Sequence, residues 1–348
     1  MNFASDNWAG AHKAISERLV RESDKYWTPY GESELDHQVE QKLSKLFERD
    51  VKVFFVATGT AANSLSLASV RKTGGIAFCH AGAHIIHHEG GAVEFMTGGA
   101  KLIPVSGGTE GKMDPTQLEK AMARHPADLH VGQKMALSIT QATEAGTIYA
   151  LDEIRALSAV ARSAGLPVHM DGARFSNAIS ALGCTPAEMT WKSGIDILSL
   201  GGTKNGCWCA EAIVFFNTDL ASDMPHLRKR AANLFSKSTF VAAQFDEWLE
   251  NDLWLTLARH SNGMAAKLSE AVGASKSSRL AWQTGGNQLF IVIRDDAAER
   301  MTAAGVPLRT WGTPESMDGK LAADEKIYRF VTSFATREED IAAVSAYL

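Results

Sequence analysis

Several features that mark other classes of protein are missing from this sequence of 348 residues. It has no run of about 18 apolar residues, the length that a membrane-spanning helix needs. Its first residues, MNFASDNWAGAHKA, lack the basic start and apolar run of a secretory signal. The formal net charge is −5, and no block of lysine and arginine resembles a nucleic-acid-binding surface. We therefore expect no membrane and no nucleic acid as partner, but small molecules and further copies of the chain.

Cysteine is also scarce. The sequence has Cys79, Cys184, Cys207 and Cys209, and none of them forms a Cys-x-x-Cys pair. Four in a chain of this length are too few for a disulfide framework, which favours a reducing, cytoplasmic location. Because Cys207 and Cys209 have no second pair to complete a zinc site, we expect no metal there.

Strand-like and helix-like segments alternate over the first two thirds of the chain. Short apolar runs typical of buried strands occur at 51–57, 76–79, 101–105, 135–140, 168–170, 195–200 and 212–216. Helical patterns lie between several of them, for example at 114–124 and 152–164. This alternation predicts an α/β fold with a mostly parallel central sheet covered by helices on both faces.

The pattern changes after about residue 219. Two long helices are predicted at 219–232 and 238–258, and a shorter mixture of strands and helices follows. We therefore expect a large domain at 1–245 and a smaller C-terminal α/β domain at 246–348. No linker rich in proline or glycine marks this boundary.

Lys204 is the first candidate for chemistry. It lies in the segment SLGGTKNG, directly after a predicted strand, on a turn crowded with glycine. Open α/β sheets bind their ligands at this end of the strands. In partly apolar surroundings a lysine loses its proton more easily and can attack a carbonyl to form a Schiff base. The alternatives are a solvated lysine on a loop or a phosphate-binding lysine, although the order of residues is not that of a P-loop.

Asp171 strengthens this interpretation. It closes the predicted strand VHMDG, which precedes the strand of Lys204 in the chain. An aspartate there can pair with the protonated pyridine nitrogen of pyridoxal 5′-phosphate (PLP) and keep the ring electron-withdrawing. A structural ion pair between Asp171 and Arg174 is the alternative. An aspartate and a lysine at the ends of separate strands are nevertheless the arrangement that a PLP site needs.

A turn of small residues offers a phosphate site. Thr58, Gly59 and Thr60 follow a predicted strand and open a helix. Backbone N–H groups and hydroxyls at such a helix start bind anions well. The turn lacks the GxGxxG pattern, which argues against a dinucleotide.

Histidine is concentrated in the segment His80–Glu89, at positions 80, 84, 87 and 88. On one helix these side chains would resemble metal ligands, but the two glycines that follow Glu89 argue against one rigid helix. An imidazole can instead stack on a flat cofactor ring. His84 is then the first candidate for the catalytic base, and Glu89 is the second.

The two ends of the chain carry further polar candidates. Ser5 lies in a polar segment close to the N-terminus, and Arg329 interrupts the apolar strand YRFVT. A buried arginine needs an anion, and a substrate carboxylate supplies a bidentate one. An ion pair with Glu338 or Asp340 would be a purely structural alternative.

Taken together, these segments resemble a known family. The motifs ASDN, YGES, TGTAAN, HMDGARFSNA and GGTKNG, with AH and E-x-G between them, occur in this order in the threonine aldolase and β-eliminating lyase group of fold-type I PLP enzymes. The sequence is most similar to low-specificity L-threonine aldolases and phenylserine aldolases. The resemblance implies an aspartate aminotransferase-like fold and cleavage of β-hydroxy-α-amino acids (L-threonine, L-allo-threonine or phenylserine) to glycine and an aldehyde. An aminotransferase or a β-eliminating lyase is the alternative activity on that fold.

The resemblance also implies roles for individual residues. Lys204 would hold PLP as a Schiff base, Asp171 would pair with the ring nitrogen and His84 would stack on the ring. Gly59, Thr60 and Lys237 would bind the phosphate of the cofactor. Ser5, Arg174 and Arg329 would bind the substrate carboxylate, and Arg174 would also lie near the cofactor. Tyr30, as a substrate contact, and Lys237 would come from a neighbouring subunit of a dimer or of a tetramer built as a dimer of dimers.

One position departs from the family pattern. Several threonine aldolases have a histidine near the β-hydroxyl of the substrate, in a segment that matches QATEAG here. Glu144 occupies that place. The identity of the base and the choice between threo and erythro substrates are therefore open from the sequence.

Overall fold

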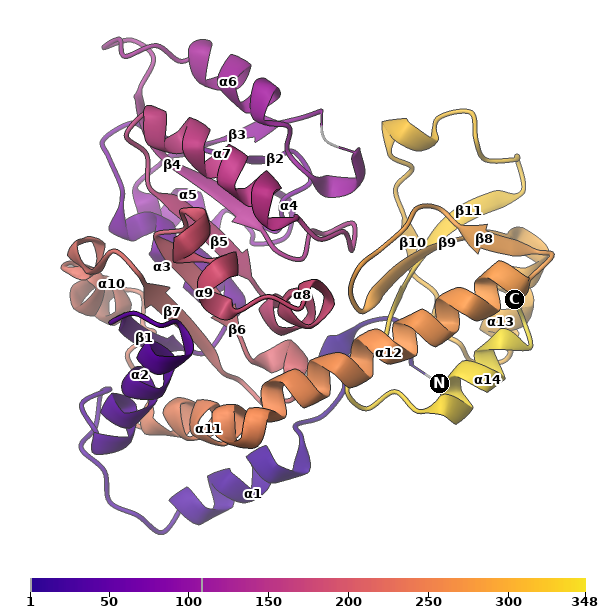
Figure 1. Ribbon diagram of the computed structural model, residues 1–348, viewed down its shortest axis with the longest axis horizontal. Helices are drawn as coiled ribbons and strands as arrows, with labels where there is room; N and C mark the ends of the chain where they lie inside the picture. The colour runs from indigo at the N-terminus through magenta and orange to yellow at the C-terminus, as the bar shows by residue number, and fades with distance from the viewer. Residues whose placement is uncertain (1, 108) are drawn as a thin grey trace.

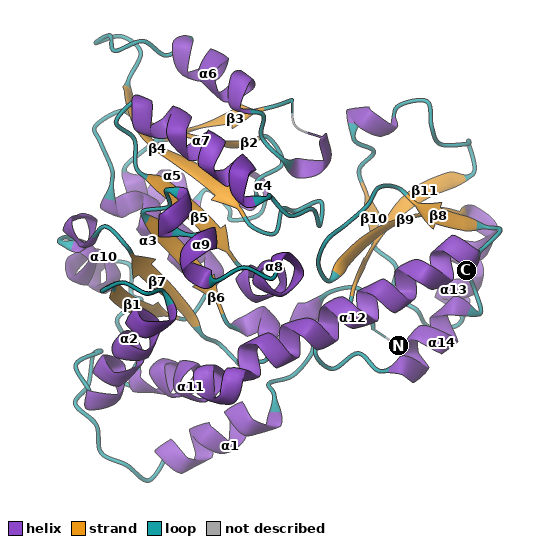
Figure 2. Ribbon diagram, in the orientation of Figure 1, coloured by secondary structure: helices purple, strands orange, loops and turns teal. Residues whose placement is uncertain are grey.

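The structure is a computed structural model that describes residues 2–107 and 109–348 (Figure 1). It contains a seven-stranded and a four-stranded sheet. Figure 2 shows the strands of the two sheets well separated, with the long helix α12 (Leu253–Ala274) reaching from one to the other. The predicted α/β class is confirmed.

The large sheet has the strand order β1-β7-β6-β5-β4-β2-β3. Its strands are β1 (Lys52–Val56), β2 (Gly75–His80), β3 (Lys101–Val105), β4 (Gln133–Thr140), β5 (Val168–Gly172), β6 (Ile197–Gly201) and β7 (Glu211–Phe215). β7 runs antiparallel to both of its neighbours, β1 and β6. The pairs without β7 are parallel. The central sheet is therefore mostly parallel, as predicted, and the carboxyl ends of β2, β4, β5 and β6 meet at one edge.

Helices cover both faces of this sheet (Figure 1). The helices of this part are α1 (Lys13–Glu22), α2 (Glu34–Leu46), α3 (Gly59–Ser69), α4 (His84–His87), α5 (Ala92–Thr97), α6 (Pro115–Ala123), α7 (Leu151–Ser163), α8 (Phe175–Leu182), α9 (Pro186–Met189), α10 (Met224–Arg230) and α11 (Thr239–Leu249). Of these, α1 packs on α11 instead of on the sheet. The predicted helices at 114–124 and 152–164 correspond to α6 and α7. Asp114 caps α6, because its side chain accepts the N–H of Gln117.

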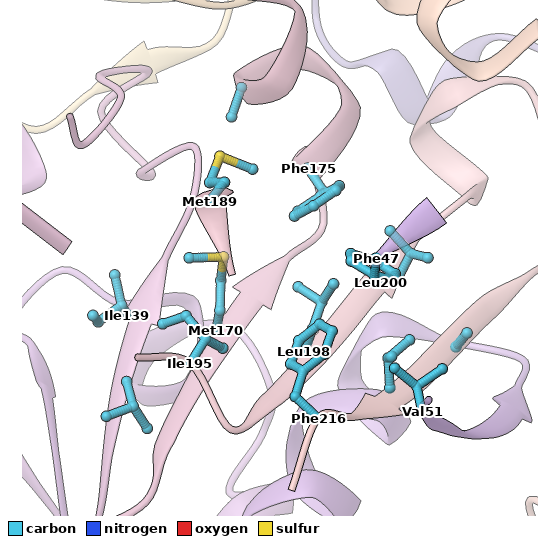
Figure 3. Close-up of a cluster of buried hydrophobic side chains, with 14 of the residues drawn as sticks. Phe47, Val51, Ile139, Met170, Phe175, Met189, Ile195, Leu198, Leu200 and Phe216 are labelled. Atoms are coloured by element: carbon cyan, nitrogen blue, oxygen red, sulfur yellow. The ribbon is translucent and has the colours of Figure 1, made fainter. Parts of the chain in front are cut away.

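The alternation of side chains along the strands divides the core between the two faces. Leu198 and Leu200 pack with Phe175 of α8 and Met189 of α9 on one face (Figure 3). Ile197 points the other way, into a cluster that includes residues of α3 and α10. Each fully buried side chain of this size contributes about 1.5–3 kcal/mol by leaving water. Strands that are apolar on both faces are the physical basis of the continuous apolar runs in the sequence.

The smaller sheet is antiparallel, with the order β10-β11-β9-β8. Its elements are β8 (Ser278–Leu280), β9 (Gln288–Arg294), β10 (Thr310–Trp311) and β11 (Glu325–Val331), with the helices α13 (Asp295–Ala303) and α14 (Glu338–Ser345). Phe3 packs in the core of this part, and its carbonyl accepts the N–H of Val331. The first residues of the chain thus lie against its last strand, and this brings Ser5 close to β11.

The expected boundary between residues 245 and 246 falls inside α11. The two sheets have separate buried clusters, but α12 contacts both α8 of the large part and strands of the small one. The assignment of 1–245 and 246–348 as domains stays a prediction.

The prediction of one long helix at 238–258 is wrong in one respect, because two helices, α11 and α12, occupy this range. The chain breaks between α11 and α12 at Asn251 and Asp252, whose φ angles are 50° and 55°. Asparagine and aspartate enter this left-handed region at lower cost than most residues, so a polar pair can redirect a helix without glycine or proline. Likewise, the helix predicted at 219–232 is regular only over α10.

None of the helices formed by residues 2–107 and 109–348 combines the length and the apolar character that a bilayer crossing requires.

Candidate active site

The carboxyl ends of β4, β5 and β6 and the start of α3 and α4 surround a cavity of about 380 Å³. The predicted residues that line it are Gly59, Thr60, His84, Glu89, Asp171, Arg174 and Lys204. Ser5 and Arg329 line a second cavity of about 640 Å³, which shares His84, Arg174 and Lys204 with the first. The structure therefore brings together nine of the predicted residues, from segments far apart in the chain.

Lys204 lies in the short helix η4 (Thr203–Asn205), directly after β6. The turn needs glycine at Gly201, because a Cβ there would come within 2.7 Å of the carbonyl oxygen of Ala173. This close approach places the lysine beside the end of β5. Burial first, and the charge of Arg174 second, hold the pKa of the Lys204 amine below its ordinary value. An amine of this kind is a better nucleophile than a solvated lysine, and the solvated-loop alternative is wrong.

Asp171 is buried, at 3% exposure, at the end of β5. Its Oδ1 accepts the backbone N–H of Ala173 at 3.0 Å, and its Oδ2 accepts the amide of Asn63 at 2.8 Å. The alternative ion pair with Arg174 is not formed. Arg174 instead donates to both carboxylate oxygens of Asp6, at 2.8 and 2.9 Å.

A hydrogen-bonded chain joins Asp171 to His84. Asn63 of α3 donates to Asp171 and also to Glu89 Oε1, at 2.8 Å in each case. Glu89 Oε1 also lies 2.9 Å from His84 Nδ1. Burial raises the pKa of Glu89, and the nearby charge of Asp171 adds to this effect. The chain fixes the orientation of the His84 ring and connects it to the carboxylate predicted to face the pyridine nitrogen.

The other histidines of the segment have structural contacts. His80 ends β2, and its Nδ1 accepts the N–H of Gly82. His87 Nε2 lies 2.7 Å from the carbonyl oxygen of Ala81. The segment forms a strand end, a loop and one helical turn instead of a single helix. The ring of His88 lies beside those of His84 and His87, with centroids 5.4 and 6.1 Å apart, and His88 also lines the second cavity. Within residues 2–107 and 109–348, no three His, Cys, Asp or Glu side chains are grouped as metal ligands.

The turn that was predicted to bind phosphate opens α3. Thr58 caps this helix by accepting the N–H of Ala61 at 3.1 Å, and Gly59 and Thr60 form its first turn. The turn lines the cavity together with Thr203 and Glu211. Burial raises the pKa of Glu211 to about 7, with a further contribution from Asp171. The positive end of the helix dipole and the free N–H groups of its first turn suit a dianion.

Arg329 enters the second cavity from β11. Its guanidinium donates to the carbonyl oxygen of Ala4 at 3.3 Å and stacks over Trp311, 5.6 Å from the ring centre. Its Nε is buried without a hydrogen-bond partner among the described residues. The alternative ion pairs are not formed, because Glu338 pairs with Lys267 and Asp340 with Arg337.

Tyr30 and Lys237 lie outside both cavities of their own chain. Lys237 lines a separate surface cavity of about 720 Å³. Tyr30 is 44% exposed, its N–H donates to the carbonyl of Ser236, and Lys229 lies over its ring. The two predicted residues are therefore neighbours on the surface. Their role in the site of another subunit stays a prediction.

Sequence reasoning missed the residues that support the site. Asn63, Asp6 and His169 were all part of recognised motifs, but no role was predicted for them. His169 lies below Asp171 on β5, with Nδ1 2.9 Å from Ser138 and Nε2 2.9 Å from Ser199. Burial lowers its pKa to about 4, so the ring is neutral. The sequence did contain a signal for this residue. His169 lies two positions before Asp171 on a predicted strand, so the two side chains were expected on the same face of the sheet.

The donors of the cavity fit PLP. A half-buried amine with a lowered pKa suits the aldehyde of the cofactor, and a carboxylate at a strand end suits the pyridine nitrogen. The first turn of α3 suits the phosphate. Two buried oxygen atoms, Asn63 Oδ1 and Glu89 Oε2, have no hydrogen-bond partner among the described residues. Both residues line the cavity, so these atoms can still form hydrogen bonds with a bound molecule.

This fold and this set of side chains define a fold-type I PLP-dependent enzyme. The family model for beta-eliminating lyases matches residues 2–296. The chain therefore belongs to the β-eliminating lyase family.

Named relatives agree with this assignment. A low specificity L-threonine aldolase of Pseudomonas aeruginosa is 40% identical over 304 residues, which cover 87% of each chain. A protein of the same name from another Pseudomonas strain is 38% identical over 334 residues, covering 92% of this chain and 96% of the relative. The solved structure of a threonine aldolase of Leishmania major superposes with a TM-score of 0.91 at 27% identity, over 99% of this chain and 97% of that one.

Proposed function

We propose that the protein is a PLP-dependent aldolase that cleaves β-hydroxy-α-amino acids to glycine and an aldehyde. The observation that carries the proposal is the Lys204 amine, which lines one cavity with Asp171 and a second with Arg329. The two named Pseudomonas relatives support the same reaction. A site for PLP and a site for an amino-acid carboxylate thus meet at one lysine.

When bound, PLP supplies a conjugated ring that takes up the electron pair left on the α-carbon of the substrate. Asp171 would keep a proton on the ring nitrogen, and Lys204 would hold the cofactor covalently. Gly59 and Thr60 would bind the phosphate, and His84 would stack on the ring.

Arg329, with Ser5 near it, binds the substrate carboxylate. This contact fixes the rotation about the bond between Cα and the amine, and that rotation decides which bond of Cα breaks. Arg174 supports the same clamp through its ion pair with Asp6. Burial alone would raise the pKa of Asp6, but Arg174 and Lys204 together hold it below its ordinary value. A charged Asp6 therefore keeps Arg174 in place.

A substrate panel tests the reaction. Threonine, allo-threonine and phenylserine in both Cα configurations are incubated with the holoenzyme, and glycine and aldehyde are measured. We expect glycine and aldehyde in equal amounts from the L-substrates. An aminotransferase or a β-eliminating lyase would instead release an oxo acid, and absence of glycine and aldehyde would contradict the proposal.

Arg329→Lys tests the carboxylate contact. Lysine keeps the charge but cannot bind a carboxylate through two parallel hydrogen bonds, which contribute about 1.5–3 kcal/mol when the partner is charged. We expect KM for the amino acid to rise at least about tenfold, with a smaller change in kcat. Arg300→Lys, on the exposed face of α13, is the control. Equal KM values in the two variants would remove Arg329 from this role.

We further propose a cytoplasmic homo-oligomer, a dimer or a dimer of dimers, in which Tyr30 and Lys237 complete the site of the neighbouring subunit. Their proximity to each other, and the exposed aromatic residues Tyr26 and Phe235 beside them, support an interface on this surface.

A hybrid experiment tests the shared site. Lys204→Ala and Lys237→Ala chains are produced separately and together. If Lys237 acts in the neighbouring site, each hybrid dimer has one intact site, and random assembly restores about a quarter of wild-type activity. Co-production that gives no more activity than the separate variants would show that Lys237 does not act across an interface.

A further inference from the structure

The retro-aldol reaction needs a group that accepts the proton of the β-hydroxyl. This group must be close to the cofactor cavity, because the bond that breaks begins at Cα. It must also be close to the cavity that contains Arg329, because the carboxylate is attached to the same carbon. Only a residue that lines both cavities satisfies both conditions.

Five residues line both cavities: Asn7, His84, Glu144, Arg174 and Lys204. Asn7 has no basic group, and the guanidinium of Arg174 offers only hydrogen-bond donors. Lys204 is the amine assigned to the cofactor. The choice therefore lies between His84 and Glu144.

The hydrogen bonds favour Glu144. His84 Nδ1 is engaged by Glu89, and that contact holds the ring in the orientation expected for stacking on the cofactor. Glu144 uses one oxygen, Oε1, to accept the backbone N–H of His84 at 2.7 Å. Its other oxygen, Oε2, is buried and has no partner that meets hydrogen-bond geometry among the described residues, although the Thr140 hydroxyl and the N–H of Glu144 itself lie near enough to the carboxylate to lower its pKa. A buried carboxylate oxygen at the junction of two cavities, left without a partner, is available to a hydroxyl of the substrate.

The loop that carries Glu144 is fixed on both sides. The side-chain amide of Gln141 donates to the carbonyl of Tyr149 at 3.0 Å and its oxygen accepts the N–H of the same residue. Trp282 of the smaller part donates its indole N–H to the carbonyl of Ala145 at 2.8 Å. The carboxylate is therefore held in position before substrate binds, as an efficient acid–base group requires.

We infer that Glu144 is the catalytic base that removes the β-hydroxyl proton of the substrate. This inference rests on the proposed aldolase function. The Oε2 atom takes the hydroxyl proton, and the O–H electron pair becomes the second bond of the aldehyde carbonyl. The Cα–Cβ bond breaks, its electron pair stays with Cα, and Cα then takes up a proton to give glycine. Glu144 afterwards releases its proton to solvent, so that no oxidant or further reactant is needed.

The electrostatic surroundings suit this role near neutral pH. Burial raises the pKa of Glu144 to about 7, and the charge of Asp171 on β5 adds to the effect. The other titratable groups that face it include Cys79 on β2, Tyr149 and His84. Lys204 and Arg174 line the same two cavities, and His80, Glu110 and Glu315 line a further cavity together with Glu144. Because the base must be ionised to accept a proton, kcat/KM should rise with pH through about 7 and then level off.

Glu144→Gln tests the assignment, because glutamine keeps the size of the side chain and can still accept the N–H of His84. We expect kcat/KM for retro-aldol cleavage of phenylserine to fall by about 10²–10⁴-fold, the usual contribution of a general base. The rise through neutral pH should disappear. Exchange of the α-hydrogen of glycine with deuterated solvent needs no β-hydroxyl base, so we expect it to stay within about threefold of wild type.

Glu119→Gln is the control, since Glu119 is exposed on α6 and lines none of the cavities that contain Glu144. The visible spectrum of the bound cofactor and the melting temperature confirm that each variant is folded and loaded. Cleavage by Glu144→Gln at the wild-type rate would overturn the assignment. A parallel loss of cleavage and glycine exchange would also overturn it, because that result indicates a structural role. Wild-type enzyme that exchanges glycine but releases no aldehyde would instead overturn the proposed function itself.

Discussion

The Lys204→Ala variant is expected to lose at least about a thousandfold in kcat/KM, which corresponds to about 4 kcal/mol of transition-state stabilisation. Both cavities share the Lys204 amine, and no other lysine among residues 2–107 and 109–348 lines either of them. The loss should therefore not be compensated by another side chain. Retro-aldol cleavage, glycine exchange and covalent attachment of PLP should all disappear together. The measurements are steady-state kinetics and the visible spectrum of purified protein with added PLP.

The fold should survive this change. The Lys204 amine makes no hydrogen bond or ion pair that the β6–η4 turn depends on, because the turn is held by backbone bonds such as Gly202 N–H to the carbonyl of Ala210. We expect a melting temperature within a few degrees of that of wild-type protein without cofactor. Lys192→Ala, which removes a surface lysine paired with Glu48, is the control. Undiminished turnover in Lys204→Ala would refute the central role of the lysine.

The prediction of a mostly parallel sheet is confirmed, and this sheet also brings the predicted strand-end residues to one cavity. Lys204 and Asp171 follow two apolar runs, and parallel neighbouring strands must bring such positions together. β5 and β6 do pair in parallel, with Asp171 opposite Ser199. The turn that contains Gly59 meets them because β1 runs in the same direction as β6 and ends at the same edge. Local patterns and one rule of sheet topology were enough for this part of the site.

The partners of these residues were beyond the reach of sequence patterns. Asp6 reaches Arg174 across 168 positions of the chain, and no periodicity or spacing encodes such a contact. The same holds for Asn63 of α3. This residue is buried like a core residue, but its side chain links Glu89 to Asp171 by hydrogen bonds. The helix break at Asn251 depends on two residues in an unusual backbone conformation, where the composition around them continues to favour a helix.

Asp171 is the position of the second large effect. Asp171→Asn keeps the shape of the side chain and its hydrogen bond from Ala173 but removes the charge that holds a proton on the ring nitrogen. Without that proton the ring withdraws electrons poorly. We expect kcat to fall by at least about a hundredfold, with weaker cofactor binding, in both retro-aldol cleavage and glycine exchange. Titration of the apoenzyme with PLP and steady-state kinetics measure the two effects.

Asp196→Asn is a demanding control for this variant. Asp196 precedes β6 at the opposite end of the strands, and its side chain also accepts a backbone N–H, that of Val168 at 2.8 Å. This control should lower stability without changing kcat of the loaded enzyme. If both variants lose kcat alike, the effect of Asp171 comes from disturbed packing of the sheet and not from its charge.

The charge of Asp171 also acts on the groups around it, which gives the variant a second signature. It raises the pKa of Glu89 and of Glu144, in each case in addition to burial. Removing the charge makes ionisation of both carboxyl groups easier, so their pKa values should fall. The residual activity of Asp171→Asn should therefore rise with pH over a lower range than the wild-type activity, whose rise is expected near pH 7. An unchanged pH profile would show that the group that titrates in the wild-type enzyme does not lie beside Asp171, and would contradict the assignment of Glu144 as the base.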